Sequence, residues 1–194
     1  MINADIELAE ESIWPSRAHA DDSGYDLFAL YEPKIVGSKS EIIGGIQYWN
    51  SIDYIEYQTG VKLGNPHEII PANIFEDFSV DQQKPFYTLL FPRSSISKYN
   101  LTLANSVGVV DHGYTGPVSC RFRYNFQPSD LRVLSHPLCN GMVVGAVNME
   151  KVYRKGDKIC QLVPMSLQSS IKFNRVDKVG ATARGSGGFG STGK

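Results

Sequence analysis

The sequence has few cysteines, no excess of charge of either sign and no long hydrophobic run. Its three cysteines, Cys120, Cys139 and Cys160, are far apart, and neither their odd number nor their spacing suits a disulfide framework, a zinc site or a redox motif. With 19 basic and 20 acidic residues, it offers no bulk charge for duplex nucleic acid or an anionic membrane. We expect reduced core cysteines, no stable nucleic-acid binding, and only local sites for phosphate.

No stretch approaches the length of a transmembrane helix, and the acidic N-terminal sequence MINADIELAEESIWPS has no apolar run of signal-peptide length. We therefore expect a protein that does not associate with membranes and is not secreted. Its expected location is the cytoplasm, or the nucleus in a eukaryotic host. The length of 194 residues suits one domain of ordinary size.

Helical periodicity is also scarce, although ANIFEDFSV could supply one or two helical turns. Short runs rich in valine, isoleucine, tyrosine and phenylalanine alternate with glycine, proline and asparagine. These runs predict an all-β fold, a sandwich or barrel. They are YDLFAL, PFYTLLF, LTLANSVGVV, PVSCRFRYNF, MVVGAVNM and KICQLVPMSL.

Two stretches differ in composition from this framework. Residues 37–84 mix glycine, asparagine, proline and acidic residues with aromatic residues, which predicts either a long loop or an extra hairpin. Residues 180–194 are rich in glycine and serine around Phe189, Arg184 and Lys194. Such a segment cannot bury enough apolar surface to fold alone, so we expect it to be flexible.

Three internal stretches carry groups suited to binding and chemistry. In FPRSSISKYNL, Arg93 stands beside two hydroxyl residues after a predicted strand, where a guanidinium and turn N–H groups can bind phosphate. In NSVGVVDHGYTGPV, a predicted hairpin places Asn105, Asp111 and Tyr114 near its mouth. In KGDKICQLV, Gln161 interrupts an apolar run, where a buried amide needs partners. Taken singly, each pattern is also common in turns and cores that have no function.

Together with DSGYDL near the N-terminus and RGSGGFGSTG near the C-terminus, these stretches form five segments in a fixed order. They resemble the five motifs of the trimeric deoxyuridine triphosphatase (dUTPase) family. The resemblance covers the chain from about residue 21 onward, except for residues 37–84 and a longer connection at residues 126–151. Agreement of five motifs in order is far more specific than any one of them.

The resemblance implies a distorted jelly-roll or β-barrel homotrimer with active sites shared between subunits. Residues 1–179 would form the β domain, with residues 37–84 as an insertion. Residues 180–194 would form a mobile glycine-rich arm that closes over the site. The implied enzyme is a Mg²⁺-dependent dUTP diphosphatase, in which water attacks the α-phosphate and releases dUMP and pyrophosphate. This activity keeps uracil out of DNA and supplies dUMP for dTMP synthesis.

The resemblance also assigns catalytic roles. Asp111 matches the carboxylate that orients and activates the attacking water. Asp26 matches a first-motif carboxylate that supports the metal and water side of the site. Arg184 matches an arm residue that meets the γ-phosphate. Mg²⁺ would be held mainly by substrate phosphates and water, with no direct protein ligand.

Substrate contacts follow in the same way. Asn105 and the backbone of residues 108–110 would read the edges of uracil, and Tyr114 would lie under the deoxyribose and crowd out a 2′-hydroxyl. Phe189 would stack on uracil. The full set of implied dUTP and dUMP contacts is Arg93, Ser94, Ser95, Asn105, Gly108, Val109, Val110, Tyr114, Gln161, Arg184, Phe189, Gly190, Ser191 and Thr192.

Two positions depart from the family pattern. Ser95 stands where the second motif usually has glycine, which affects how closely the backbone can approach the substrate. Gly113 stands at a position that is often acidic, two residues after Asp111. Neither change removes a catalytic group.

Two other functions remain as alternatives. A dCTP deaminase, or a bifunctional dCTP deaminase and dUTPase, shares this fold and a similar Arg-Ser-Ser turn, but it needs a glutamate on the strand PVSCRFRYNF, which has none. A regulatory protein could use the dUTPase scaffold with residues 37–84 as its contact surface.

Overall fold

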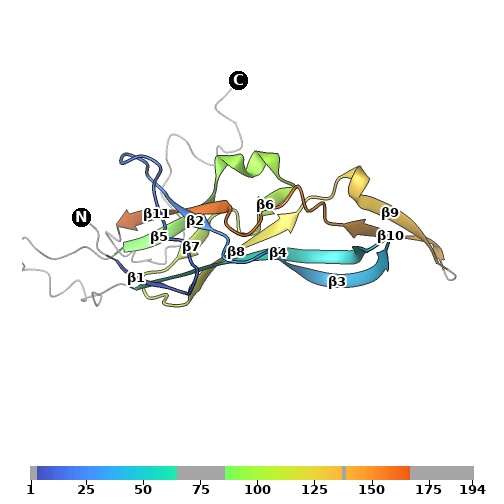
Figure 1. Cartoon of the computed structure of the whole chain (residues 1–194), viewed down its shortest axis with the longest axis horizontal. Helices are drawn as coiled ribbons and strands as arrows, with labels where there is room; N and C mark the ends of the chain where they lie inside the picture. Colours follow the sequence, from blue (N-terminus) through green and yellow to red (C-terminus); the bar gives the residue numbers. More distant parts are fainter. Residues whose placement is uncertain (1–3, 65–85, 137–138, 167–194) are drawn as a thin grey trace, which may run out of the picture.

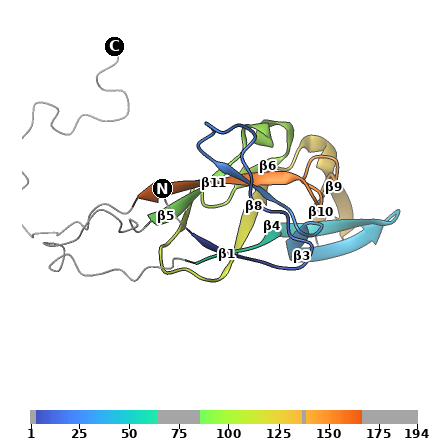
Figure 2. The same cartoon turned by 60° about the vertical axis from the view of Figure 1, so that its left-hand side comes forward.

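The computed structural model describes residues 4–64, 86–136 and 139–166 of the chain. Across these ranges the chain forms strands in two sheets that lie over one another, with two short 3-10 helices (Figures 1 and 2). The prediction of an all-β, jelly-roll-like fold is confirmed. The expected helical turns at residues 72–80 and the arm at residues 180–194 lie outside the described residues. Within the described ranges, no helix has the length and apolar character that crossing a membrane requires.

The larger sheet is organised around one long strand. That strand, β4, pairs with β1 and β3 and also with β8 and β10, while β6 and β9 extend the sheet at its two ends. Neighbouring strands in this sheet pair antiparallel. The strands are β1 (Asp5–Leu8), β3 (Lys34–Ile43), β4 (Ile46–Gly64), β6 (Leu101–Leu103), β8 (Pro117–Tyr124), β9 (Leu131–His136) and β10 (Cys139–Ala146).

The smaller sheet carries most of the candidate site. Its order is β2, β11, β5, β7, and all neighbours are antiparallel. Its strands are β2 (Tyr25–Phe28), β5 (Phe86–Pro92), β7 (Gly108–Val110) and β11 (Lys158–Ser166). The 3-10 helix η2 (Ser94–Lys98) follows β5 directly, and η3 (Pro128–Asp130) precedes β9.

The core forms between the two sheets because alternate residues of the strands point inward. In β8 the pattern is strict, with Val118, Cys120, Phe122 and Tyr124 buried and the residues between them exposed. The smaller sheet contributes apolar side chains from β2, β5 and β11 to the same cluster. Cys120 and Cys160 are buried free thiols, as predicted. The Cys139 side chain lies outside the described residues.

Of the two alternatives for residues 37–84, the hairpin is present over the described part. β3 and β4 pair around a turn in which Gly44 and Gly45 have φ of +57° and +82°, a region that favours glycine. β4 then continues into the main sheet, where Ile55 and Tyr57 are fully buried. That residues 37–84 are an insertion relative to the family stays a prediction.

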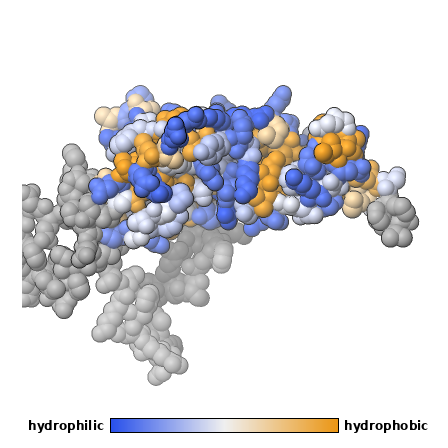
Figure 3. Space-filling view, turned by 60° about the horizontal axis from the view of Figure 1, so that its bottom comes forward, coloured by the Kyte–Doolittle hydropathy of each residue, from blue (hydrophilic) through white to orange (hydrophobic). Residues whose placement is uncertain are grey.

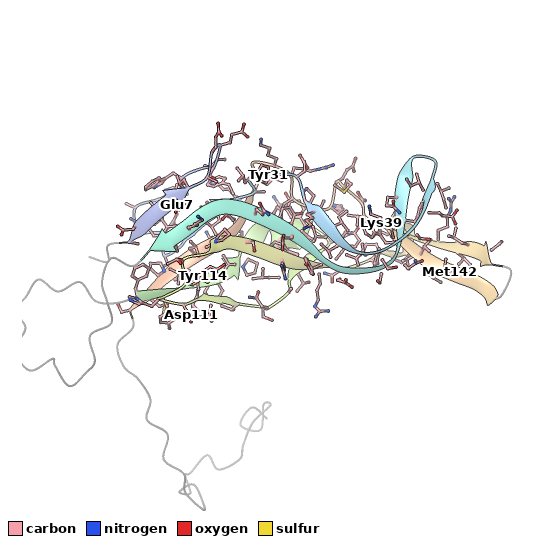
Figure 4. All side chains as sticks on the ribbon, turned by 90° about the horizontal axis from the view of Figure 1, so that it is seen from below. Glu7, Tyr31, Lys39, Asp111, Tyr114 and Met142 are labelled. Atoms are coloured by element: carbon pink, nitrogen blue, oxygen red, sulfur yellow. The ribbon has the colours of Figure 1, made fainter. Side chains whose placement is uncertain are left out.

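The hairpin and β9–β10 form one end of an elongated molecule (Figure 1). Exposed apolar side chains gather there, and Figure 3 shows hydrophobic surface toward this end. They are Ile42, Ile46, Val133 and Val143. Asp111 and Tyr114 lie toward the other end, and Figure 4 shows them far from Lys39 and Met142.

The predicted hairpin around Asp111 is wrong in one respect. β7 pairs with β5 in the smaller sheet, whereas β8 pairs with β4 and β6 in the larger one. Residues 111–116 therefore cross from one sheet to the other instead of closing a hairpin. The sequence suggested two strands and a turn, but strand partners depend on contacts distant in the chain, which the local pattern does not contain.

Candidate active site

Asp26 on β2 is a buried residue at the centre of a partly exposed polar cluster. Arg93 Nε donates to Oδ1 at 2.8 Å and Gln161 Nε2 to the same oxygen at 3.1 Å. Lys158 Nζ lies 2.9 Å from Oδ2. Strand pairing explains the arrangement, because Gln161 lies directly opposite Asp26 across β2 and β11. Three of the sequence motifs thus meet at one carboxylate.

The carboxylate of Asp26 is 2% exposed, and its charge is retained by its partners. Burial is the largest single influence and raises the pKa of Asp26. Hydrogen bonds from Lys158 and Gln161, with the charges of Arg93 and Lys158, together outweigh burial and hold the pKa below its ordinary value. The ionised carboxylate therefore fixes two cationic side chains at this end of the sheet.

Gly24 of the first motif makes room for this cluster. A Cβ atom at position 24 would lie 3.1 Å from Gln161 Cβ and 3.4 Å from its Cδ. Any larger residue there would push the Gln161 side chain away from Asp26. The glycine thus permits the close contact of the first and fourth motifs.

The Arg-Ser-Ser turn stands beside this cluster. Arg93 precedes η2, its carbonyl accepts from the Ile96 N–H at 3.0 Å, and Ser97 Oγ donates to the Ser94 carbonyl at 3.1 Å. The turn presents Ser94 as an exposed residue and Ser95 as a half-buried one. Guanidinium and hydroxyl groups here form a surface that suits phosphate oxygens.

β7 is an edge strand of the smaller sheet. Within the described residues it has β5 as its only strand neighbour, so one side of its backbone is left to pair with something else. The Asn105 side chain lies against this backbone, since a Cβ on Gly108 would be 3.1 Å from Asn105 Nδ2. The Asn105 amide and the backbone groups on the outer side of β7 are placed to form hydrogen bonds with the edge of a flat polar ring.

Asp111 follows β7 in an exposed position at the rim of a small hollow. The hollow is lined by Leu63, Gly64, Phe86, Tyr87, Thr88, Val110, Asp111, His112 and Tyr114. The ring of Tyr114 is fixed there, because its hydroxyl donates to the Pro117 carbonyl at 3.0 Å. His112 Nδ1 lies 3.0 Å from the Phe86 carbonyl oxygen. Asp111 thus has a defined turn around it and solvent access.

Within a single chain, Asp111 lies far from the Asp26 cluster. Val110 lies opposite Thr88 on β5, so Asp111 follows at the level of Tyr87, whereas Arg93 lies beyond the far end of the same strand. At about 3.3 Å per residue, six positions along β5 correspond to about 20 Å. Arg93 is in addition directed toward β2 by its bond to Asp26, on the side away from β7. The candidate catalytic and phosphate-binding groups therefore stand at opposite ends of the sheet.

Sequence reasoning missed Lys158. It stands three residues before Gln161, and strict alternation along β11 would put the two side chains on opposite faces. The pairing register shifts between Lys158 and Cys160, which marks a bulge, and both side chains reach Asp26. The presence of Lys158 in KGDKICQLV was the only signal in the sequence, because residue spacing gives no sign of the bulge.

Among the described residues, no group of three or more histidine, cysteine, aspartate or glutamate side chains is arranged to hold a metal ion. The oxygens of Asp26 are already bonded to cations and to Gln161. Arg184, Phe189, Gly190, Ser191 and Thr192 lie outside the described residues.

Comparison with known proteins gives related sequences and folds. The dUTPase family model matches residues 139–193. The deoxyuridine 5'-triphosphate nucleotidohydrolase of Escherichia phage T5 is 33% identical over 115 residues, which are 59% of this chain and 64% of that protein. The enzyme of the same name from Clostridium acetobutylicum is 28% identical over the whole chain and 98% of its own length.

Solved structures share the fold. A dUTPase of Staphylococcus bacteriophage 80alpha, determined with dUpNHpp, matches with a TM-score of 0.60 and 19% identity over 99% of both chains. A dUTPase from phage phi11 of S. aureus, described with a structural Mg(II) ion, matches with a TM-score of 0.53 and 20% identity over 91% of this chain and 97% of its own.

Proposed function

The chain belongs to the dUTPase family, and we propose that it hydrolyses dUTP to dUMP and pyrophosphate. The relatives carry this activity in their names, and the candidate site has the groups that it needs. The observation that carries the proposal is the meeting of Asp26, Arg93 and Gln161, three separate motif residues, in one bonded cluster. The cluster lies in a sheet whose edge strand offers backbone groups beside Asn105.

In the proposed reaction, Asp111 accepts a proton from the water that attacks the α-phosphorus. The bond from this phosphorus to the bridging oxygen then breaks, and pyrophosphate leaves with the electron pair. Arg93, Ser94, Ser95 and Gln161 bind the triphosphate, while Asp26 keeps Arg93 and Lys158 in place. Mg²⁺, when bound, neutralises charge on the phosphates, and we propose that substrate oxygens and water hold it.

We further propose a homotrimer in which one subunit supplies Asp111 and another supplies the Asp26 cluster. The separation of about 20 Å along β5 supports this, because attacking water and phosphate must lie within a few ångströms of each other. Residues 180–194 complete the site in this proposal, with Arg184 at the γ-phosphate and Phe189 over the uracil.

The outward face of the smaller sheet also supports association. In register across three strands, Val163, Leu89 and Val109 form an apolar row. Val109 is 60% exposed and Met165, on the same face, is 38% exposed. An apolar sheet face between the two halves of the candidate site is suited to burial against another subunit.

Substrate selection tests the assignment of the β7 edge and Tyr114. We expect kcat/KM for dUTP to exceed that for UTP by about a hundredfold or more, because in this proposal the Tyr114 ring, whose hydroxyl donates to the Pro117 carbonyl, lies under the deoxyribose and crowds out a 2′-hydroxyl. Pyrophosphate release should be measured with dUTP, UTP, dCTP and dTTP, each with and without Mg²⁺. Similar values for dUTP and UTP would show that Tyr114 does not contact the sugar.

The same samples decide the deaminase alternative. Release of ammonia from dCTP would assign that activity, and β8 has no glutamate to move protons at the base. We expect no ammonia.

A further inference from the structure

Lys158 is a cation of the candidate site to which the proposed reaction assigns no contact with the substrate. It begins β11, and its Nζ lies 2.9 Å from Asp26 Oδ2 and 5.8 Å from the centroid of the Phe28 ring. Phe28 is the residue directly opposite Lys158 across β2 and β11. An ammonium group that contacts both a carboxylate and an aromatic face is held in a defined position.

Arg93 and Lys158 share the single negative charge of Asp26. Arg93 Nε and Lys158 Nζ bind different oxygens of this carboxylate, at 2.8 and 2.9 Å. Because Gln161, the remaining member of the cluster, is neutral, the cluster carries a net charge of +1. Two cations bound to one carboxylate repel each other, and the carboxylate compensates only one of them. An anion bound here would balance the second charge.

Both cations retain hydrogen-bond donors for such an anion. Arg93 uses Nε for Asp26, which leaves the N–H groups of its two Nη atoms, and Lys158 uses one of its ammonium hydrogens. Among the residues that the structure describes, neither side chain has a further hydrogen-bond or ion-pair partner. The Asp26 side chain is 3% exposed, whereas those of Arg93 and Lys158 are 27% and 38% exposed. The carboxylate is thus buried, and the two cations reach the surface.

The cluster lies on the face of the smaller sheet that we propose contacts another subunit. Gln161 and Val163 are two residues apart on β11 and therefore point to the same face, and Val163 belongs to the outward apolar row described above. Lys158 reaches this face through the bulge. In the proposed homotrimer, the Asp111 of a neighbouring subunit and the substrate beside it meet this face, which brings the triphosphate to both cations.

We propose that Lys158 is a phosphate-binding residue, which together with Arg93 holds the triphosphate of dUTP through two cations bound to Asp26. The inference rests on the proposed function and adds a substrate contact that the motif resemblance does not assign. Arg93 offers a planar set of donors and Lys158 a compact point charge, so the pair can bind two oxygens of a polyphosphate chain at once.

Binding of the non-hydrolysable analogue dUpNHpp in the presence of Mg²⁺, measured by calorimetry, tests this contact. Lys158→Gln removes the charge but keeps an amide N–H that can donate to Asp26. We expect it to raise Kd for dUpNHpp about tenfold or more, because a charge-assisted hydrogen bond to phosphate is lost. Lys158→Arg keeps the charge, and its Kd should lie within about threefold of that of the unaltered protein. A residue that served only to satisfy Asp26 would tolerate glutamine without loss of binding.

Lys155→Gln is the matched control, since it makes the same change of charge at an exposed lysine that pairs with Glu11 at 2.9 Å and not with Asp26. Its Kd should equal that of the unaltered protein, and thermal unfolding without nucleotide should show that all variants are folded. An unchanged Kd in Lys158→Gln, or equal losses in Lys158→Gln and Lys158→Arg, would overturn the inference. An unaltered protein that neither binds dUpNHpp nor hydrolyses dUTP would instead overturn the proposed function.

Discussion

Replacing Asp111 with asparagine should lower kcat for dUTP by about a thousandfold while dUTP still binds. General bases contribute about 10²- to 10⁴-fold to rate, and an amide of the same shape cannot accept the proton of the attacking water. Asp111 stands exposed at the rim of the hollow beside Tyr114, so the change should not disturb packing. Turnover should be measured by pyrophosphate release, and binding by calorimetry with the non-hydrolysable analogue dUpNHpp.

Asp53→Asn provides the matched control. It makes the same change of charge on an exposed residue of β4, away from the candidate site. The control should keep full turnover. If Asp111→Asn kept a kcat within about tenfold of the control, Asp111 would not be the base, and the water would have to be activated by another group.

Removing residues 181–194 should lower kcat by about a hundredfold or more. In the proposal this segment supplies Arg184 to the γ-phosphate and Phe189 to the uracil, and its loss would leave the phosphates open to bulk water. In the part of the chain that the structure describes, the strands of both sheets and the core residues all lie before residue 167, so the truncated chain should still fold and associate.

Sedimentation and thermal unfolding should show that the shortened protein keeps its oligomeric state and stability. The full-length variants Arg184→Ala and Phe189→Ala should each reproduce part of the loss, which separates the two contacts from the effect of length. A truncated enzyme with nearly full turnover would mean that residues 181–194 do not contribute to the site.

Much of the fold could be read from local sequence patterns. Each of the six predicted β segments contains a strand, because alternation such as that of Val118, Cys120 and Phe122 is a direct consequence of a half-buried strand. β1 and β9 were missed, since β1 spans only Asp5–Leu8 and β9 lay in a stretch taken for a long connection. Polar residues on an exposed strand leave little pattern to detect.

From the sequence, only residues within the recognised motifs could be assigned to the candidate site. That Arg93 and Gln161 belong together followed from the resemblance, and their meeting at Asp26 follows from strand pairing. The position of Lys158 beside Asp26 depends on a β-bulge, which residue spacing does not encode. Predicting the distance between Asp111 and Arg93 likewise requires knowing that β7 pairs with β5 and not with β8.

The most direct test of the shared site is a mixture of two inactive chains, Asp111→Asn and Arg93→Ala. Each alone should form inactive trimers. If one subunit supplies Asp111 and a neighbour supplies Arg93, random mixed trimers made by refolding equal amounts together should regain about a quarter of full activity. Mass spectrometry of differently tagged chains should confirm that mixed trimers form. Mixed trimers without activity would contradict the account, because both groups would then have to act within a single chain.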